Sequence, residues 1–434
     1  MEQITKPHCG ARLDRLPDCR WHSSMFAIVA FGLLVCWSNA VGGLILAQLK
    51  ALGWTDNSTT ATFSAITTAG MFLGALVGGI IGDKTGRRNA FILYEAIHIA
   101  SMVVGAFSPN MDFLIACRFV MGVGLGALLV TLFAGFTEYM PGRNRGTWSS
   151  RVSFIGNWSY PLCSLIAMGL TPLISAEWNW RVQLLIPAIL SLIATALAWR
   201  YFPESPRWLE SRGRYQEAEK VMRSIEEGVI RQTGKPLPPV VIADDGKAPQ
   251  AVPYSALLTG VLLKRVILGS CVLIAMNVVQ YTLINWLPTI FMTQGINLKD
   301  SIVLNTMSMF GAPFGIFIAM LVMDKIPRKT MGVGLLILIA VLGYIYSLQT
   351  SMLLITLIGF FLITFVYMYV CYASAVYVPE IWPTEAKLRG SGLANAVGRI
   401  SGIAAPYAVA VLLSSYGVTG VFILLGAVSI IVAI

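Results

Sequence analysis

Residues 79–88 read Gly-Ile-Ile-Gly-Asp-Lys-Thr-Gly-Arg-Arg, and they join two long apolar segments, 61–82 and 89–108. Each segment is about 20 residues long, which is the length of helix that crosses the hydrocarbon core of a bilayer. The stretch between them is polar and contains a glycine, one acidic residue and three basic residues. It therefore predicts two membrane-spanning helices joined by a short charged loop.

The rest of the chain has the same composition as these two segments. Of its 434 residues, 56% are hydrophobic and 12% are charged, whereas a soluble domain has about 45–50% and about 25%. Too little polar surface remains to cover a globule in water. We predict an all-α membrane protein with twelve transmembrane helices. The predicted spans are 25–48, 61–82, 89–108, 111–135, 147–170, 182–201, 263–290, 301–323, 330–348, 351–378, 389–413 and 417–434.

The net charge of +10 would indicate a nucleic-acid partner in a soluble protein, but its distribution indicates membrane topology. Loops rich in Lys and Arg stay on the cytoplasmic side. With a cytoplasmic N-terminus, Lys50, Arg181 and Lys299 are the only basic residues expected outside. We therefore expect a multi-pass protein with its N-terminus in the cytoplasm, and no nucleic-acid partner.

Six spans precede a charged central segment and six follow it. The expected divisions are a cytoplasmic tail (1–24), a first six-helix bundle (25–201), a cytoplasmic linker with short helices (202–262) and a second bundle (263–434), whose last helix we expect to be truncated. No Gly-x-x-x-x-Gly-Lys-Ser/Thr motif is present, which argues against ATP as the energy source. We expect no cofactor, and no metal site, because the tail residues Cys9 and Cys19 match no standard zinc spacing.

The two halves contain related loop motifs. The Asp83-to-Arg88 pattern after the second span is matched by Asp324-Lys-Ile-Pro-Arg-Lys329 after the eighth. Glu138-Tyr-Met-Pro-Gly-Arg-Asn-Arg145-Gly after the fourth span is matched by 379–390 after the tenth, Pro-Glu-Ile-Trp-Pro-Thr-Glu-Ala-Lys-Leu-Arg-Gly. Two matches at equivalent places predict an internal repeat, as in transporters built from parallel six-helix halves.

On these motifs the chain resembles the major facilitator superfamily over essentially its whole length. Pro203-Glu-Ser-Pro-Arg-Trp-Leu209 after the sixth span is typical of the sugar-porter and organic-ion branch. Trp286-Leu-Pro-Thr289 in the seventh span resembles the organic-ion and synaptic-vesicle-protein relatives more than true sugar porters. The resemblance implies two pseudo-symmetric six-helix bundles and a metabolite transporter of the bacterial inner membrane.

The resemblance also implies that the loop motifs form a cytoplasmic gate, which opens and closes as the bundles rock. From the residues themselves, we expect Gly79 and Gly82 to let two helices approach closely and Gly86 to permit a tight turn. A purely topological role of the basic residues remains an alternative. The expected gate residues are Gly79, Asp83, Gly86, Arg87, Arg88, Glu138, Arg145, Glu204, Arg207, Asp324, Glu380 and Arg389.

Ionisable residues inside membrane spans are costly and usually functional. Arg118 and Arg399 remain charged at any relevant pH, so each needs water or an anionic partner. Organic-ion carriers that resemble the eleventh span have Arg at this position when they carry anions. We therefore expect an anionic substrate such as a carboxylate or a sugar acid. The alternative for Arg399 is a structural bond to another helix.

Coupling to protons is expected, but one residue of the related symporters is missing. Those proteins usually have an Asp in the first span, where this chain has Ser38-Asn39. Glu95 and His98, three residues apart and therefore on one helix face, are the candidate proton carriers. Glu95 could instead lie in water near the cytoplasmic end. Without an acidic partner, Arg118 could bind substrate directly.

Further polar residues could line a central cavity or form bonds between helices. Besides Arg399 and Arg118, the candidates are Gln280, Asn277, Tyr281, Asn285, Trp286, Asn157, Tyr372 and Asn395.

We predict a monomeric secondary transporter that takes up a small, anionic metabolite with protons. The alternatives are a symporter or uniporter for a neutral sugar or polyol, and a membrane sensor with a transporter-like fold. An enzyme is not expected, because the chain has none of the usual hydrolase motifs.

Overall fold

The computed structural model describes residues 7–141, 145–240, 253–383 and 386–434, which are mostly helical and contain no β-strand. The expected all-α fold is confirmed. In chain order the helices are α1 (Cys9–Asp14), α2 (Arg20–Val35), α3 (Gly42–Ala51), α4 (Asn57–Thr85), α5 (Arg87–Ala106), α6 (Met111–Tyr139), α7 (Arg145–Asn157), α8 (Ser159–Leu170), α9 (Ala176–Tyr201), α10 (Pro206–Ser211), α11 (Tyr215–Thr233), α12 (Tyr254–Leu257), α13 (Gly260–Thr293), α14 (Leu298–Met309), α15 (Gly311–Val322), α16 (Arg328–Ser347), α17 (Met352–Cys371), the π-helical turn η2 (Tyr372–Tyr377), α18 (Val378–Glu380) and α19 (Lys387–Ala433).

The helices follow the twelve predicted spans, although several spans are built from more than one piece. The first consists of α2 and α3, separated by residues 36–41, and the fifth of α7 and α8, which meet at Trp158. The eighth is interrupted at Phe310. The eleventh and twelfth form the single element α19, which turns at Gly417, where φ is 65° and ψ is −160°. Taking pieces joined end to end together, nine helices in the described ranges are long and apolar enough to cross a bilayer.

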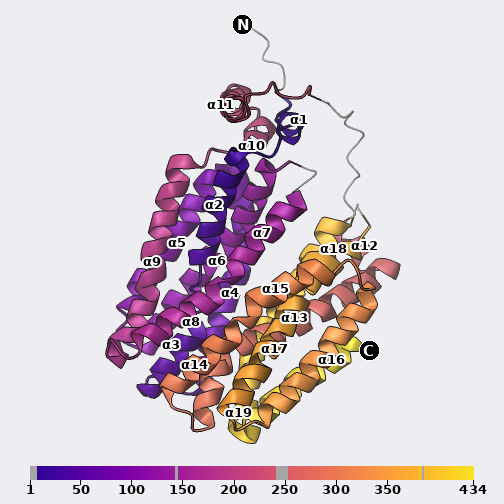
Figure 1. Ribbon diagram of the computed structural model, residues 1–434. Coiled ribbons are helices and arrows are strands. Elements are labelled where there is room, and N and C mark those ends of the chain that lie inside the picture. Colours follow the sequence, from indigo (N-terminus) through magenta and orange to yellow (C-terminus); the bar gives the residue numbers. More distant parts are fainter. Residues whose placement is uncertain (1–6, 142–144, 241–252, 384–385) are drawn as a thin grey trace.

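The helices form two groups that lie side by side. Figure 1 shows α2–α9 in indigo to magenta on one side and α13–α19 in orange to yellow on the other. The short helices α1, α10 and α11 lie beyond one end of the first group, and we call this end of the molecule the tail side. The ribbons of the two groups diverge toward the tail side and come together at the opposite end, near α3, α14 and the turn of α19.

Contacts between the two groups follow the internal repeat. Span 2 (α4) packs on span 11 (α19), and span 8 (α14–α15) packs on span 5 (α7–α8). These pairs are equivalent, since spans 2 and 5 of the first half correspond to spans 8 and 11 of the second. The α3 part of span 1 packs on span 7 (α13), and span 7 is the span of the second half that corresponds to span 1. The helix packing therefore has the pseudo-two-fold symmetry that the repeated motifs predict.

Within each half, glycines bring two helix backbones together at equivalent places. A Cβ added at Gly70 or Gly74 of α4 would lie 2.3 or 2.1 Å from a carbonyl oxygen of α6. A Cβ added at Gly311 or Gly315 of α15 would lie 2.4 or 2.3 Å from a carbonyl oxygen of α17. Because no side chain fits at these distances, the two close helix pairs require glycine.

The prediction that Gly79 lets two helices approach is wrong. A Cβ added at Gly79 meets no atom within 4 Å, and one at Gly82 would make only ordinary van der Waals contacts. The close approach begins earlier on α4 because the side of the helix that faces α6 carries Gly70, Gly74 and Gly78. Four-residue spacing keeps these glycines on one face, whereas Gly79 is turned away from it.

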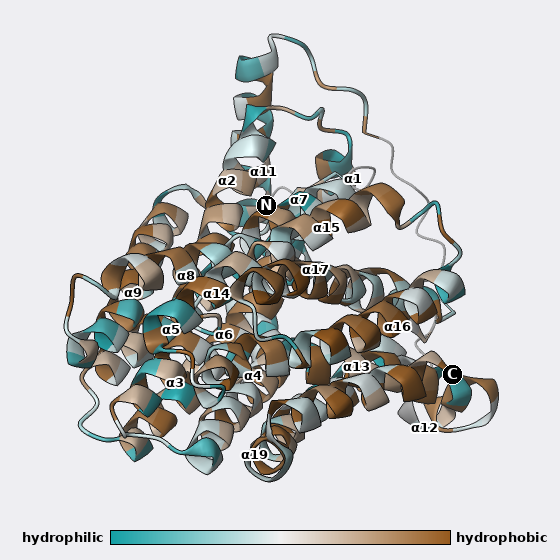
Figure 2. Ribbon diagram, turned by 60° about the horizontal axis from the view of Figure 1, so that its bottom comes forward, coloured by the Kyte–Doolittle hydropathy of each residue, from teal (hydrophilic) through white to brown (hydrophobic). Residues whose placement is uncertain are grey.

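The outer surface of the two groups is apolar, as expected for helices surrounded by lipid. Large hydrophobic side chains such as Ile80 on α4, Leu192 on α9 and Val341 on α16 are exposed. Figure 2 shows hydrophobic residues along the long helices and hydrophilic residues mainly in the connections and on α11. Exposed apolar area on this scale is incompatible with water, so the chain is a multi-pass membrane protein.

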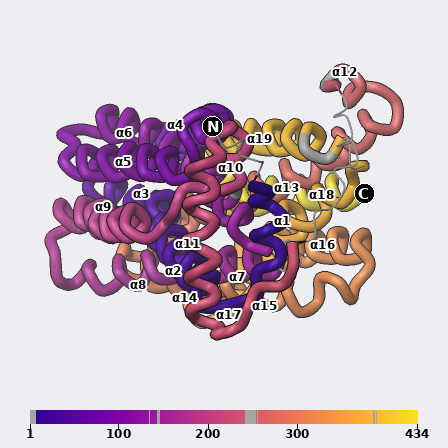
Figure 3. Tube along the Cα trace, turned by 90° about the horizontal axis from the view of Figure 1, so that it is seen from above, coloured from indigo at the N-terminus to yellow at the C-terminus, as the bar shows by residue number. Residues whose placement is uncertain are grey.

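The tail and the linker form a small unit on the tail side. Seen from above in Figure 3, α1, α10 and α11 lie over the first group of helices, while α12 lies beside the second. Leu13 and Leu16 pack against Trp208 and Met222 in a separate hydrophobic cluster. This cluster attaches the N-terminal tail to the linker helices.

Ion pairs reinforce the attachment of the tail. The Arg12 guanidinium donates to both carboxylate oxygens of Glu226 at 3.0 and 2.7 Å, and Arg15 donates to the same carboxylate at 2.6 Å. Burial opposes ionisation of Glu226, but the hydrogen bonds from the two arginines outweigh it, so that its pKa is lowered. The folded state therefore keeps the pairs ionised at neutral pH.

Candidate functional site

The first loop motif forms a compact acid–base cluster on the tail side, which we define as Asp83, Arg87, Glu138 and Glu204. Arg87 bonds to Asp83 at 2.6 Å and to Glu138 at 3.0 Å. The Glu204 carboxylate accepts hydrogen bonds from the backbone N–H groups of Arg87 and Arg88 at the N-terminus of α5, at 2.7 and 3.2 Å. A carboxylate at this position satisfies free N–H groups and the helix dipole.

Gly86 is required where this cluster meets the backbone. Its φ of 97° and ψ of 162° lie in a region that is essentially restricted to glycine. A Cβ added there would lie 2.3 Å from the carboxylate of Glu204. The prediction that Gly86 permits a tight turn is consistent with this geometry, and the contact with Glu204 adds a second reason.

The second half contains an equivalent cluster, formed by Asp324, Arg328 and Glu380. Arg328 bonds to Asp324 at 3.0 Å and to Glu380 at 2.9 Å. Sequence reasoning selected the two acids and missed Arg328. Arg328 follows Asp324 by four residues, just as Arg87 follows Asp83. This repeated spacing is the sequence feature that could have identified Arg328.

The other predicted gate residues lie around these two clusters. Arg88 donates to the carbonyl of Trp199 at 2.6 Å, and Arg207 pairs with Asp14 of the tail at 3.0 Å. Arg389 lies in the first turn of α19, and the side chain of Arg145 lies outside the described residues. No ion pair between two described residues joins the first bundle to the second, and the pairs of the N-terminal tail join it to the linker.

Arg118 lies in a second site, buried inside the first bundle at the break in span 1. Its side chain is 1% exposed. Nη1 donates to the backbone carbonyl of Ser38 at 2.7 Å, and Nε donates to Oγ1 of Thr67 at 3.2 Å. The guanidinium carbon lies 4.7 Å from the centre of the Phe63 ring. Among the described residues, the partners of this buried cation are therefore neutral groups and an aromatic face.

The break at residues 36–41 explains why a backbone carbonyl is available to Arg118. Where a helix ends, its last carbonyl groups lack their usual partners four residues later. Ser38 lies between α2 and α3, and Arg118 of α6 bonds to its oxygen. Sequence reasoning missed Ser38 because a backbone carbonyl carries no sequence signal, and it missed Thr67 because its hydroxyl meets Arg118 only through the packing of α4 on α6.

The other half of the chain also reaches the space beside Arg118. A Cβ added at Gly42 would lie 3.0 Å from Nη2 of Arg118 and 3.4 Å from Oδ1 of Asn285 on α13. Gly42 is therefore flanked by a polar side chain from each half. Of the predicted substrate residues, Arg118 and Asn285 are the pair that the structure brings together across the two groups.

Glu95 and His98 are both fully buried on α5, so Glu95 does not lie in water. Nδ1 of His98 lies 3.5 Å from Oε2 of Glu95, and Nε2 of His98 lies 2.7 Å from Oγ of Ser38. Among the described residues, neither oxygen of Glu95 has a hydrogen-bond partner. Ser38 thus contacts His98 with its side chain and Arg118 with its backbone.

A separate group of predicted residues lies where α13 packs on α19. Nδ2 of Asn277 would be 3.0 Å from a Cβ added at Gly398, and the Tyr281 ring would be 3.1 Å from one at Gly402. Arg399 follows Gly398 on α19; its side chain is half-buried, and its enclosed Nη1 has no hydrogen-bond partner among the described residues. Asn277 and Tyr281 thus contact the helix that carries Arg399.

The remaining candidates are more scattered. Gln280 lies beside Tyr160 and Tyr367, whose rings meet edge to face at 5.3 Å between the two halves. Trp286 is fully buried. Asn157 and Asn395 bond to carbonyls of their own helices at 2.7 and 2.9 Å. Tyr372 stacks on Tyr377 at 5.2 Å, and a Cβ added at Gly332 of α16 would meet its hydroxyl.

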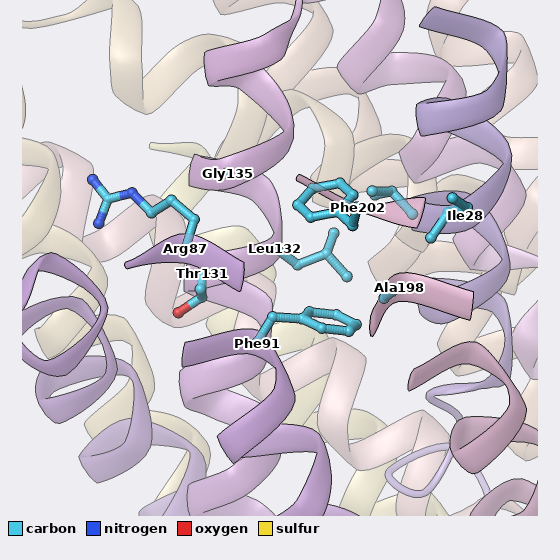
Figure 4. Close-up of a pocket in the computed structure, with 9 residues that line it drawn as sticks. Ile28, Arg87, Phe91, Thr131, Leu132, Gly135, Ala198 and Phe202 are labelled. Atoms are coloured by element: carbon cyan, nitrogen blue, oxygen red, sulfur yellow. The ribbon is translucent and has the colours of Figure 1, made fainter. Parts of the chain in front are cut away.

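A small apolar pocket lies between α2, α5, α6 and α9, near the first acid–base cluster. Phe91, Leu132 and Phe202 line it together with the stem of Arg87. Figure 4 shows the guanidinium of Arg87 directed away from the two phenylalanine rings. None of the predicted substrate residues lines this pocket, and the charged residue that lines it, Arg87, is already paired with Asp83 and Glu138.

Comparison with known proteins identifies relatives over the whole chain. The family model described as Major Facilitator Superfamily matches residues 26–406. The Escherichia coli inner membrane metabolite transport protein YdjE is 44% identical over 98% of this chain and 94% of its own length. The Bacillus subtilis putative metabolite transport protein YyaJ is 30% identical over the same shares. The Acinetobacter baylyi niacin transporter NiaP is 25% identical over 92% of this chain and 89% of its own.

A solved structure has the same fold. The partially occluded inward open conformation of the E. coli xylose transporter XylE matches with a TM-score of 0.74, over 95% of this chain and 96% of that one. The sequences are 17% identical, so this match concerns the fold alone.

Proposed function

The chain belongs to the major facilitator superfamily and is a membrane metabolite transporter, and on that premise we propose that it takes up a small organic anion together with protons. The substrate would be a carboxylate or a sugar acid, carried by alternating access between the two bundles. The observation that carries this proposal is Arg118, a fully buried cation that has no carboxylate among its hydrogen-bond partners in the described part of the chain.

Two further observations support an anionic substrate. Arg399 has an enclosed guanidinium nitrogen without a hydrogen-bond partner among the described residues, and a carboxylate can accept two parallel hydrogen bonds from such a group. One relative is named a niacin transporter, and niacin is a small carboxylic acid. Arg118, Asn285 and Arg399 are the residues we assign first to the substrate.

The pair of Glu95 and His98 supports coupling to protons. Both side chains are fully buried within one helix turn of each other, and buried Glu and His side chains in membrane spans are typical of proton relays in transporters. Proton coupling in this chain would thus use α5 in place of the missing acid of the first span.

The two acid–base clusters support a gate on the tail side. They occupy equivalent loops of the two halves, and no ion pair between described residues joins one half to the other. We place the tail side in the cytoplasm, because the loops on this side contain most of the basic residues. The location would be the inner membrane of a bacterium, as the name of the relative YdjE states for that protein, and the active form a monomer.

One observation favours the runner-up, a symporter or uniporter for a neutral sugar or polyol. Gln280, Tyr160 and Tyr367 form a neutral polar group between the halves, and such groups suit hydroxyl ligands. A transporter-like sensor would bind the ligand without moving it.

Ligand stabilisation of the purified protein tests the choice of substrate class. The panel contains carboxylates (acetate, nicotinate), a sugar acid (gluconate), neutral sugars (xylose, glucose), a polyol (inositol) and a cation (choline). We expect at least one carboxylate or sugar acid to raise the unfolding temperature of the wild type. Arg399→Ala should lose this effect, because the hydrogen bonds to a charged group are worth about 1.5–3 kcal/mol.

The matched control is Arg200→Ala, which removes an exposed arginine at the end of α9. This variant should respond to the panel like the wild type. Stabilisation by neutral sugars or by choline alone, unchanged in Arg399→Ala, would contradict the anionic substrate and leave the assignment as a transporter intact.

A further inference from the structure

The break in span 1 joins two buried charged groups that lie on different helices. Ser38 accepts a hydrogen bond from Arg118 of α6 at its carbonyl oxygen, and its hydroxyl lies within 2.7 Å of His98 of α5. His98 in turn lies 3.5 Å from Glu95. Hydrogen bonds thus join Arg118, Ser38 and His98, and Glu95 lies next to His98 without a hydrogen bond to it. We call these four residues the buried relay.

The relay accounts for the charge balance inside the first bundle. Arg118 is 1% exposed, and Glu95 and His98 are not exposed at all. The other acidic and basic residues of α2, α4, α6 and α9 lie within about two turns of a helix end. An isolated charge in the interior costs several kcal/mol, and Glu95 is the deeply buried acid on these helices that can compensate the permanent charge of Arg118.

The bond between His98 and Ser38 favours one tautomer of a neutral imidazole. Nε2 of His98 can accept the hydroxyl proton of Ser38, which places the proton of a neutral imidazole on Nδ1, facing Glu95. We assign this tautomer from the positions of the two partners. Among the described residues, Cys36, in the same break as Ser38, is a further titratable side chain that interacts with Glu95 from a different element.

We infer that Glu95 is the exchangeable counter-ion of Arg118, and that the transported anion replaces it. When Glu95 takes up a proton from water, the positive charge of Arg118 is left uncompensated, and a monovalent anion beside Arg118 and Asn285 restores neutrality. When the anion leaves, Glu95 releases its proton. This inference rests on the proposed anion transport. It specifies that one proton crosses the membrane with each monovalent anion, so that one transport cycle moves no net charge.

The relay also explains how the exchange reaches the other half of the molecule. Ser38 lies between α2 and α3, and α3 packs on α13, where Gly43 lies against the backbone carbonyls of Ile284 and Asn285. A change in the bonds to Ser38 alters the junction that positions α3 against α13. Binding of the proton and the anion at the relay is thereby linked to the contact between α3 and α13, which joins the two bundles at the end opposite the tail side.

The proton site can be tested without knowledge of the substrate, by infrared difference spectroscopy of the purified protein titrated with acid. We expect the carboxyl C=O band of a buried protonated acid to appear in the wild type and to be absent in Glu95→Gln. The control Glu177→Gln, which alters an exposed acid in the first turn of α9, should keep the band. In Arg118→Gln the band should persist at a higher pH than in the wild type. A band that remains in Glu95→Gln, or that does not move in Arg118→Gln, would overturn the relay.

The coupling is tested in liposomes with acetate, nicotinate and gluconate. For the anion that the wild type carries, binding should tighten by up to about tenfold for each unit that the pH falls. In Glu95→Gln, binding should be independent of pH, exchange of labelled for unlabelled anion should continue, and accumulation driven by a pH gradient should be lost. Continued exchange shows that the variant is folded.

The outcomes separate the two proposals. If the wild type binds none of these anions, the proposed function fails, whereas the infrared titration still decides whether Glu95 and Arg118 are coupled. If the wild type carries an anion but Glu95→Gln still accumulates it with a pH gradient, the proposed function stands and the relay is wrong. A membrane potential that drives uptake of a monovalent anion in the wild type would also overturn the one-to-one stoichiometry.

Discussion

Arg118→Gln is expected to lower the initial rate of carboxylate uptake into liposomes by at least about 100-fold, since losing one partner of a buried charge pair costs about 3–5 kcal/mol and 1.4 kcal/mol corresponds to a factor of ten. The neutral amide can still bond to Ser38 or Thr67, but it cannot hold both positions of the guanidinium. It also leaves Glu95 without its compensating charge. Uptake of the radiolabelled anion under a fixed pH gradient measures the effect.

Two companion variants show whether the effect of Arg118→Gln comes from charge. Arg118→Gln combined with Glu95→Gln removes both buried charges, and we expect its unfolding temperature to exceed that of Arg118→Gln alone. Arg200→Gln, an exposed arginine on α9, should keep the uptake rate of the wild type. If Arg118→Gln retains more than half of the wild-type rate, Arg118 does not bind the substrate.

Gly86→Ala is expected to have the second large effect, on the first acid–base cluster. Forcing a non-glycine residue into its conformation, at φ 97° and ψ 162°, costs about 1–3 kcal/mol. The added methyl group would also displace the Glu204 carboxylate, which accepts hydrogen bonds from three backbone N–H groups, those of Arg87, Arg88 and Ser205. Together these costs should lower the unfolding temperature by several degrees and impair transport.

The same motif supplies the control for Gly86→Ala. Gly79 lies seven residues earlier on α4, and a Cβ added there meets no atom within 4 Å. Gly79→Ala should therefore leave stability unchanged or slightly increase it, because alanine favours helix. Equal effects of the two substitutions on the unfolding temperature and on uptake would show that the contact with Glu204 does not determine the role of Gly86.

The membrane spans could be predicted from sequence because length and hydrophobicity decide whether a helix crosses the bilayer. The interruptions at residues 36–41, Trp158 and Phe310 could not. The first of these contains no proline or glycine, and it is stabilised by partners from α5 and α6, Arg118 and His98. Such tertiary support has no local signature.

Sequence patterns single out the residues of the candidate site, but they do not show which of these residues contact one another. Arg118, Glu95 and His98 stand out because charged residues inside a span are rare. The sequence does not show that Arg118 bonds to the backbone carbonyl of Ser38 while His98 bonds to its hydroxyl. The glycine contacts show the same limit, since the small residues of α4 are visible in the sequence but the face that meets α6 is decided by the packing of Gly70 and Gly74.

The most direct test of the central claim is uptake of the panel compounds by liposomes that contain the purified wild-type protein, with and without an inward proton gradient. The proposed function predicts that a carboxylate or sugar acid accumulates against its own concentration gradient, and that accumulation stops when the proton gradient is removed. Accumulation of xylose, glucose or inositol with no flux of any anion would contradict it.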